Sequence, residues 1–224
     1  MEVVLGTAAE RKGGHIARRR SDGQLVLRET AQTPAEDLES FRDYARWRYY
    51  NTNSLWIDLD AIAARLADGG RLELPVIVNR KTVDPRDSSS PPVLQLESAM
   101  GAAIGSFPGA GLLQVPRRRF VPVKTTDDLL LLRSDVFRLG DDFRVEAATA
   151  DGTQPFIALD KRYFGIIDGF EARMPAGPPS LRQAQQLVVN GDVSFGAGVV
   201  VRGDVRLDAP PGGLRIDDGT VLDG

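Results

Sequence analysis

Aliphatic residues recur at intervals of six in the C-terminal part of the chain, at Leu187, Val193, Val199 and Val205. Glycines fall between them, at positions 191, 196, 198 and 203. A short period of aliphatic residues with interspersed glycines is typical of a parallel β-helix, in which each turn stacks on the one before it. Repeat folds generally need at least about three repeats to bury a core, and about three turns are visible here. The pattern therefore favours a short β-helix over ordinary β-hairpins with glycine turns, which stay open as the alternative.

A Pro- and Gly-rich break, MPAGPPS at residues 174–180, separates this tail from the rest of the chain. The sequence thus predicts two domains, residues 1–174 and residues 175–224, and it leaves open whether the second domain is complete. In the first of them candidate strands and helices alternate, beginning with an apolar strand at Glu2–Leu5. Alternation of this kind is typical of an α/β fold with a largely parallel or mixed sheet.

Two candidate helices precede the middle of the chain. Thr33 is followed by Pro34 and, three residues on, by Glu36. This is the pattern of a capping box, so we expect a helix that begins here and ends near Asn51–Asn53. Asp58 is expected to cap a second helix, which the glycine pair after residue 68 would stop.

Three further segments complete the predicted α/β domain. The apolar run Leu74–Val78 predicts a strand that is buried on both faces. Gln95–Phe107 is predicted to be a helix whose small residues allow close packing, followed by a strand at Leu112–Val115. Thr125 or Thr126 is expected to cap a helix at Asp127–Arg133.

Composition excludes several classes of protein. There is no cysteine, so disulfides and thiolate metal sites are excluded, and a reducing cytoplasm fits. A formal net charge of −3 does not favour nucleic acid or an anionic membrane as a partner. No apolar run approaches the roughly 18 residues that span a bilayer, and the N-terminus lacks the apolar core of a signal peptide. His15 is the only histidine, which argues against a zinc site, and we predict no metal ligand in this chain.

Two segments could bind an anion. Arg117, Arg118, Arg119 and Lys124 lie within eight residues, just before a predicted helix N-terminus. Helix N-termini with cations beside them are ready sites for phosphate, although a solvated basic loop explains the same residues. The second segment is Lys12-Gly13-Gly14-His15, in which a glycine pair lets the backbone approach a ligand. A simple glycine turn remains the alternative for it.

Three polar residues could bind a sugar. Asn51 and Asn53 carry amides that both donate and accept hydrogen bonds, as hydroxyl recognition requires, and Glu29 carries an acceptor at a strand end. Helix capping by the two asparagines, and a plain exposed carboxylate at Glu29, stay open as alternatives.

Taken in order, the motifs resemble the UTP–glucose-1-phosphate uridylyltransferase (UDP-glucose pyrophosphorylase) family over nearly the whole chain. The matching stretches are RKGGHIARRR (11–20), YNTNSLW (50–56), VNRKTVDP (78–85), VLQLESAMGAAIGSF (93–107), VPRRRFVPVKTTDDLLLLRSD (115–135) and LVVNGDVSFGAGVVVRGDV (187–205). The resemblance implies the C-terminal part of a Rossmann-like nucleotidyltransferase mixed sheet, followed by a short left-handed parallel β-helix.

The same resemblance implies a reaction and a site. UTP and glucose 1-phosphate give UDP-glucose and pyrophosphate with Mg²⁺, and catalysis is mainly positioning and charge neutralisation. Lys124 is implied as the catalytic residue and phosphate contact. Gly14 is implied near the sugar, while Glu29 and Asn53, with Asn51 as a companion, are implied to hold sugar hydroxyls.

Some of the family's motifs are missing from these 224 residues. No glycine-rich triphosphate loop, second lysine, uracil pocket or magnesium aspartate is recognisable in the sequence. We therefore expect the chain to be a C-terminal portion that is inactive alone, with the Mg²⁺ ligand in an absent N-terminal part. Two alternatives stay open. The chain could be a non-catalytic module that pairs with a separate N-terminal half or forms a homo-oligomer through its β-helix. It could also belong to the related UDP-N-acetylhexosamine pyrophosphorylases.

Overall fold

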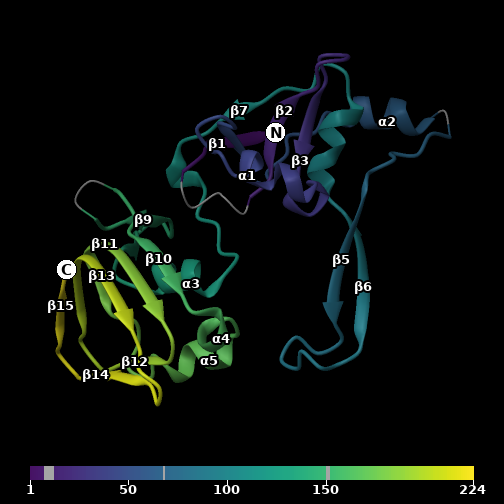
Figure 1. The fold of residues 1–224 in the computed structure, drawn as a ribbon. Coiled ribbons are helices and arrows are strands. Elements are labelled where there is room, and N and C mark those ends of the chain that lie inside the picture. Colours follow the sequence, from purple (N-terminus) through teal and green to yellow (C-terminus); the bar gives the residue numbers. More distant parts are fainter. Residues whose placement is uncertain (8–12, 68, 150–151) are drawn as a thin grey trace. The chain divides into compact units, whose positions relative to one another are not determined.

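The computed structural model describes residues 1–7, 13–67, 69–149 and 152–224, and it divides into two compact units, Met1–Phe120 and Val121–Gly224 (Figure 1). Lys12, one of the predicted anion contacts, lies outside the described residues. The domain boundary that the sequence predicts, after residue 174, falls inside the second unit. None of the described helices is long and apolar enough to cross a membrane.

A five-stranded mixed sheet forms the centre of the first unit, in the order β3-β2-β4-β1-β7. β1 pairs with β7 in parallel, and the other neighbours are antiparallel. Its core is aliphatic and includes Val3, Ile16 and Ile104. The mixed sheet of an α/β fold, and its first strand, are thus confirmed. The strands are β1 (Glu2–Leu5), β2 (His15–Arg18), β3 (Leu25–Arg28), β4 (Tyr49–Asn51) and β7 (Leu113–Gln114).

The helix predicted from Thr33 to the Asn51 region is wrong. Only short pieces form: η2 (Thr30–Gln32), η3 (Ala35–Asp37) and α1 (Leu38–Phe41). The Thr33 hydroxyl does not cap a helix but donates to the carbonyl oxygen of Glu29, at 2.9 Å. Asp43 then accepts from two backbone N–H groups in a turn, which diverts the chain into strand β4. The second predicted helix is confirmed as α2 (Leu59–Ala67), with Asp58 Oδ1 accepting at its start.

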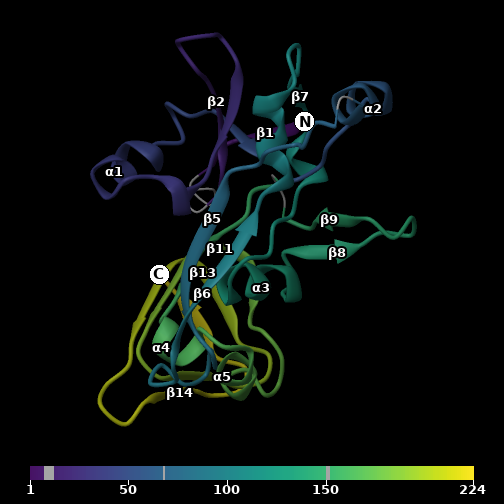
Figure 2. The ribbon, with the colours of Figure 1, turned by 90° about the vertical axis from the view of Figure 1, so that its right-hand side faces the viewer.

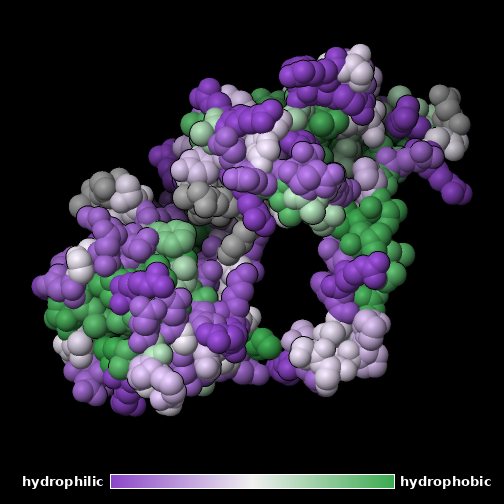
Figure 3. All heavy atoms as spheres, in the orientation of Figure 1, coloured by the Kyte–Doolittle hydropathy of each residue, from purple (hydrophilic) through white to green (hydrophobic). Residues whose placement is uncertain are grey.

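An antiparallel hairpin of β5 (Val76–Thr82) and β6 (Pro92–Ser98) replaces two predicted elements (Figures 1 and 2). The strand predicted to be buried on both faces is wrong in its burial, since Val76 is 62% exposed and only Ile77 is buried. The predicted helix at Gln95–Phe107 is also wrong in its first part. Residues 95–98 belong to β6, where pairing with β5 outweighs local helix preference, and only η4 (Met100–Ser106) is helical. Hydrophobic residues gather along the hairpin (Figure 3), with Leu96 65% exposed.

The second unit begins with α3 (Thr126–Arg133), which carries the predicted cap. Thr125 and Asp128 form a capping box, so the sequence identified this start correctly. The unit's other short elements are β8 (Phe137–Leu139), β9 (Val145–Ala147), β10 (Phe156–Leu159), α4 (Lys161–Phe164) and α5 (Ile167–Ala172).

Parallel strands make up the rest of the second unit. β10, β11, β13 and β15 form one sheet with parallel pairing throughout, and β12 pairs with β14 in parallel. The four aliphatic residues at intervals of six are all buried in one core. Ordinary antiparallel hairpins are therefore wrong for these strands. Their bounds are β11 (Ser180–Asn190), β12 (Val193–Phe195), β13 (Val200–Asp208), β14 (Leu214–Ile216) and β15 (Val221–Asp223).

Candidate functional site

Four of the predicted site residues meet at one end of the sheet in the first unit. Gly14 immediately precedes β2, and Glu29 immediately follows β3. Because these strands are antiparallel, with His15 opposite Arg28, the two residues are adjacent across the pair. The backbone N–H of Asn51, at the end of β4, donates to the carbonyl oxygen of Gly14 at 3.0 Å. Sheet pairing thus gathers residues that are far apart in sequence.

In its observed position, the Glu29 carboxylate fills the space that a side chain at position 14 would take. A β-carbon there would lie 2.5 Å from Glu29 Oε1 and 2.7 Å from Glu29 Cδ. Atoms that close overlap, so a glycine at this position is what allows the carboxylate to lie against the backbone. The glutamate is partly exposed, so its carboxylate can accept hydrogen bonds from a ligand's hydroxyls.

The two asparagines have different roles in the structure. Asn51 Oδ1 accepts from the backbone N–H of Asn53 at 2.8 Å, which forms a local turn. Asn53 has a φ of 63°, in the left-handed region that asparagine tolerates better than most residues, and its side chain is exposed. The side-chain amide of Asn53 is therefore exposed to solvent, and Asn51 stabilises the turn that exposes it. Neither caps a helix, because β4 is a strand.

Glu2 belongs to this region as well, although no sequence motif points to it as a site residue. Its side chain is buried beneath the turn that carries Asn53, where Oε1 accepts from Trp56 Nε1 at 3.0 Å. A glutamate in an otherwise apolar strand was the available signal, since buried carboxylates are rare unless they have partners. A second neighbour, Gly101 in η4, leaves space for the amide of Asn51: a β-carbon at 101 would lie 3.2 Å from Asn51 Nδ2.

His15 has a structural role beside the site. Its ring is fully buried and stacks on Trp47, with ring centroids 4.7 Å apart. Its Nε2 lies 3.2 Å from Arg28 Nη1, so we infer that Nε2 accepts and the ring is neutral. Burial, with a smaller contribution from Arg28, lowers the pKa of His15 from 6.5 to about 4. Within the described part of the chain, no group of three histidine or acidic residues could hold a metal ion.

The remaining predicted residue, Lys124, lies in the second unit. Its backbone N–H donates to Asp128 Oδ2 at 2.9 Å, which places it directly before the capped N-terminus of α3. Its side chain is exposed and carries a charge that an anion could approach. The arginine run forms a short 3₁₀ turn, η5 (Arg117–Arg119), in the first unit. Arg119 Nη2 lies 3.4 Å from Glu2 Oε1, and the Arg117 guanidinium lies over the ring of Phe120, 5.5 Å from its centroid.

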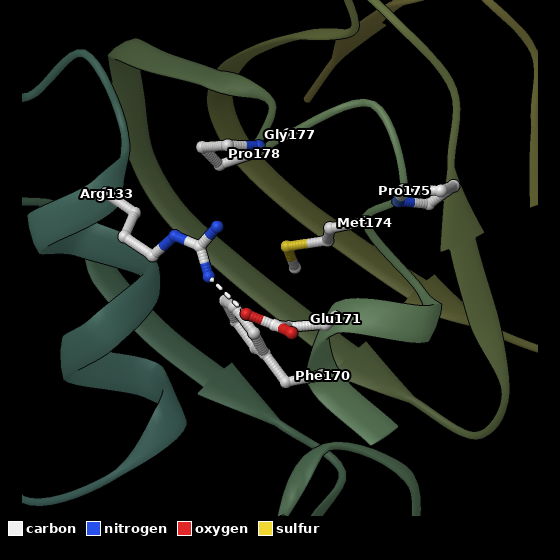
Figure 4. A pocket seen from close by; sticks show the side chains of 7 residues that line it. All are labelled: Arg133, Phe170, Glu171, Met174, Pro175, Gly177 and Pro178. Carbon is white, nitrogen blue, oxygen red and sulfur yellow. Dashed lines mark hydrogen bonds and ion pairs between the residues drawn. The ribbon is translucent and has the colours of Figure 1, made fainter. Parts of the chain in front are cut away.

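A pocket in the second unit has none of the predicted site residues in its lining (Figure 4). It has a volume of about 240 Å³ and an apolar floor that includes Phe170 and Met174. Arg133 Nη1 and Glu171 Oε1, 3.1 Å apart, form an ion pair at its edge. Because these two charges satisfy each other, the pocket offers little unsatisfied chemistry to a ligand.

Comparison with known proteins gives the chain's relatives. The family model "UTP--glucose-1-phosphate uridylyltransferase" matches residues 1–202. The enzyme of that name from Saccharomyces cerevisiae is 40% identical over 224 residues, which cover 100% of this chain and 44% of that protein. The one from Hordeum vulgare is 41% identical over 225 residues, covering 100% of this chain and 46% of its own length.

Solved structures give the same picture. UDP-glucose phosphorylase from Trypanosoma brucei superposes with a TM-score of 0.93 at 46% identity, covering 100% of this chain and 48% of that one. A mutant of UDP-glucose pyrophosphorylase from Leishmania major, in complex with UDP-glucose, gives 0.87 at 44% identity, covering 100% and 50%. The chain thus spans about half the length of the proteins it matches.

Proposed function

The chain belongs to the UTP–glucose-1-phosphate uridylyltransferase family, and on that premise we propose that these residues supply the sugar-phosphate side of a uridylyltransferase site. The proposed reaction joins UTP and glucose 1-phosphate to give UDP-glucose and pyrophosphate. The family consists of nucleotidyltransferases. The names of the relatives favour glucose over an N-acetylhexosamine as the sugar.

One observation carries the proposal: the cluster of Gly14, Glu29, Asn51 and Asn53 at one end of the sheet. Glu29 is an acceptor for sugar hydroxyls, and the amide of Asn53 can both accept and donate. Gly14 permits the carboxylate to lie against the backbone, with the contact distances given above. We assign the sugar to this cluster, with Asn51 acting through the backbone of Asn53.

Lys124 is the proposed catalytic residue. In the reaction, a phosphate oxygen of glucose 1-phosphate attacks the α-phosphorus of UTP, and the bond to the departing pyrophosphate breaks. Negative charge on the phosphates is the main obstacle, and no proton needs to be transferred to a leaving group of this kind. A lysine ammonium beside a helix N-terminus supplies charge at such a centre.

Mg²⁺ is the proposed cofactor, and it would supply further charge neutralisation on the phosphates when bound. The described residues contain no group of three ligating side chains that fits it. We place no metal contact on Gly14, Glu29, Asn51, Asn53 or Lys124, and the proposal keeps the Mg²⁺ ligand in an N-terminal part of the enzyme.

We also propose that the parallel strands after residue 175 form a short left-handed β-helix, preceded by the nucleotidyltransferase part at residues 1–174. The stacking of β11, β13 and β15 in one parallel ladder, and of β12 on β14 in another, supports the β-helix, whereas the parallel pairing of β10 with β11 crosses the proposed boundary. Homo-oligomer formation through that β-helix is one role for it. A cytoplasmic location fits a chain without cysteine.

A second candidate function is that of a non-catalytic half that pairs with a nucleotide-binding polypeptide. The exposed apolar residues of the β5–β6 hairpin, Val76, Val78, Leu94 and Leu96, favour it, because large exposed apolar patches mark interaction surfaces. This role uses the same sugar cluster and differs in requiring a partner for turnover.

A titration of the chain with glucose 1-phosphate, monitored by two-dimensional NMR, tests the proposal. We expect saturable shifts at the amides of residues 13–15 and 51–53. Glu29→Gln should weaken binding by about fivefold, since a carboxylate acceptor is lost. Glu36→Gln is the matched control, because Glu36 is an exposed glutamate in η3 of the same unit. Equal affinities for both variants and the unaltered chain would refute the assignment.

A further inference from the structure

Glu2 carries a buried carboxylate at an unusual place, in the first strand of the sheet. It is 5% exposed, and it is one of three buried polar or charged residues in the described ranges, with His15 and Ser134. A buried charge is costly unless it is paired and hydrogen-bonded. Its Oε1 accepts from Trp56 Nε1 at 3.0 Å and lies 3.4 Å from Arg119 Nη2. Trp56 lies three residues after Asn53, a proposed sugar contact, and Arg119 lies in the arginine run that could bind an anion.

The peptide groups of Glu2 form hydrogen bonds to the same loop. The N–H of Glu2 donates to the carbonyl oxygen of Ser54 at 2.9 Å, and Thr52 Oγ1 donates to the carbonyl oxygen of Glu2 at 3.0 Å. Thr52 and Ser54 are the two neighbours of Asn53. The left-handed backbone of Asn53 is thus fastened on both sides by one residue, and from within by the Asn51 amide.

The side chain of Glu2 matters most for the far end of the loop. The pairing of β1 with β4 ends where Val3 lies opposite Asn51, so the segment 52–56 runs beyond the regular ladder. Trp56 is 74% exposed, and packing therefore contributes little to fixing its position. A hydrogen bond to a charged, buried acceptor is stronger than one to a neutral acceptor. The bond from Trp56 to the Glu2 carboxylate therefore contributes most to the position of this end of the loop.

We propose that Glu2 is a positioning residue for the sugar-binding loop. It fixes the segment 52–56 through its carboxylate and peptide groups, so that Asn53 stays presented to the sugar. The contact with Arg119 ties that loop to the arginine turn. The inference has two parts. That Asn53 is presented to a sugar rests on the proposed function, whereas that Glu2 fixes the position of the loop does not.

Hydrogen exchange of the backbone amides of Asn53 and Ser54 measures the fastening directly. Trp56→Phe removes the donor but keeps an aromatic ring at an exposed position, so the fold is preserved. We expect exchange in the loop to become about tenfold faster, confined to residues 51–56. Glu2→Gln keeps a carbonyl acceptor for Trp56 but loses the charge, so its exchange rate should lie between that of the unaltered chain and that of Glu2→Leu, which removes the acceptor. Arg119→Ala should show a smaller increase and Arg118→Ala, its exposed neighbour, none.

Affinity measurements separate positioning from a merely structural role. Trp56→Phe should bind glucose 1-phosphate about fivefold more weakly, while binding of inorganic phosphate stays unchanged. Unchanged loop exchange in Trp56→Phe would overturn the proposal, and so would faster exchange with unaltered sugar-phosphate affinity. If the unaltered chain binds no glucose 1-phosphate, the proposed function fails. Exchange then still decides the fastening: a localised increase supports it, and an increase spread over the whole first unit overturns it.

Discussion

The carboxylate of Glu29 lies so close over Gly14 that a β-carbon at position 14 would be 2.5 Å from Glu29 Oε1. A β-carbon is essentially never found this close to another heavy atom, so the Glu29 carboxylate or the backbone of residue 14 must move if the glycine is replaced. The two residues are 15 positions apart, and the antiparallel pairing of β2 with β3 brings them together. Their contact ties the backbone of one predicted motif to the side chain of another.

Gly14→Ala should displace the Glu29 carboxylate. We expect a loss of under about 1 kcal/mol in the free energy of unfolding, because the carboxylate ends a flexible, partly exposed side chain that can move away from the added methyl group. Binding of glucose 1-phosphate should weaken in parallel. Urea denaturation and NMR titration measure the two effects. Gly111→Ala is the control, since a β-carbon there meets nothing within 4 Å. Equal behaviour of the two variants would contradict the proposed packing.

Removal of the Lys124 ammonium should weaken the binding of inorganic phosphate and of glucose 1-phosphate alike, by up to about tenfold at low salt. The physical reason is that the lysine acts on phosphate charge and not on the sugar. Lys124→Arg should retain most of the affinity, and Lys161→Ala, an exposed lysine in α4 of the same unit, should retain all of it. A variant Lys124→Ala with unaltered phosphate affinity would remove this residue from the proposed site.

Stability should depend on pH through His15. Its pKa is lowered in the folded chain from 6.5 to about 4, so between these values the unfolded chain binds a proton that the folded chain does not. The free energy of unfolding should therefore fall as the pH is lowered from about 6.5 to about 4, by at most about 1.4 kcal/mol per pH unit. Urea midpoints at pH 7 and pH 4.5 measure this. His15→Phe keeps a ring against Trp47 and should reduce the difference; an unaltered difference would place its origin elsewhere.

Leu187→Ala should destabilise the second unit strongly. The side chain is fully buried in the large core of that unit, and removal of such a leucine typically costs about 2–5 kcal/mol because a cavity remains. Leu139→Ala, at a position that is 65% exposed in the same unit, should cost under about 1 kcal/mol. Denaturant titration followed by circular dichroism gives both values. Similar losses at the two positions would mean that the parallel strands do not enclose a packed core.

The purified 224-residue polypeptide should release no pyrophosphate from UTP with Mg²⁺ and glucose 1-phosphate. The reason is that its sequence contains no recognisable glycine-rich loop for the triphosphate. A coupled pyrophosphate assay measures this, with a full-length relative such as the Saccharomyces cerevisiae enzyme as the positive control. Robust turnover by the polypeptide would show that the residues present are sufficient, and would refute this prediction.

Local sequence signals predicted the elements that depend on local chemistry. The helix starts at Asp58 and Thr125 are predictable because Asp58 Oδ1 accepts from the backbone of the next turn, and Thr125 forms a capping box with Asp128. The six-residue period after Leu187 identified buried positions, because burial alone requires an aliphatic side chain there. Prediction failed at Gln95, which lies in a strand, since pairing with β5 outweighs the helix preference of its own neighbours.

For this protein, the sequence by itself determined the residue types of the proposed site, the family resemblance and the six-residue period of the tail. Each of these depends on residues that are close together along the chain. The tertiary structure decided which of those residues meet. Sheet pairing brings Gly14, Glu29 and Asn51 to one end of the sheet, and it buries Glu2 against the loop that presents Asn53. Such contacts depend on strand register over dozens of residues, and no local pattern encodes that register.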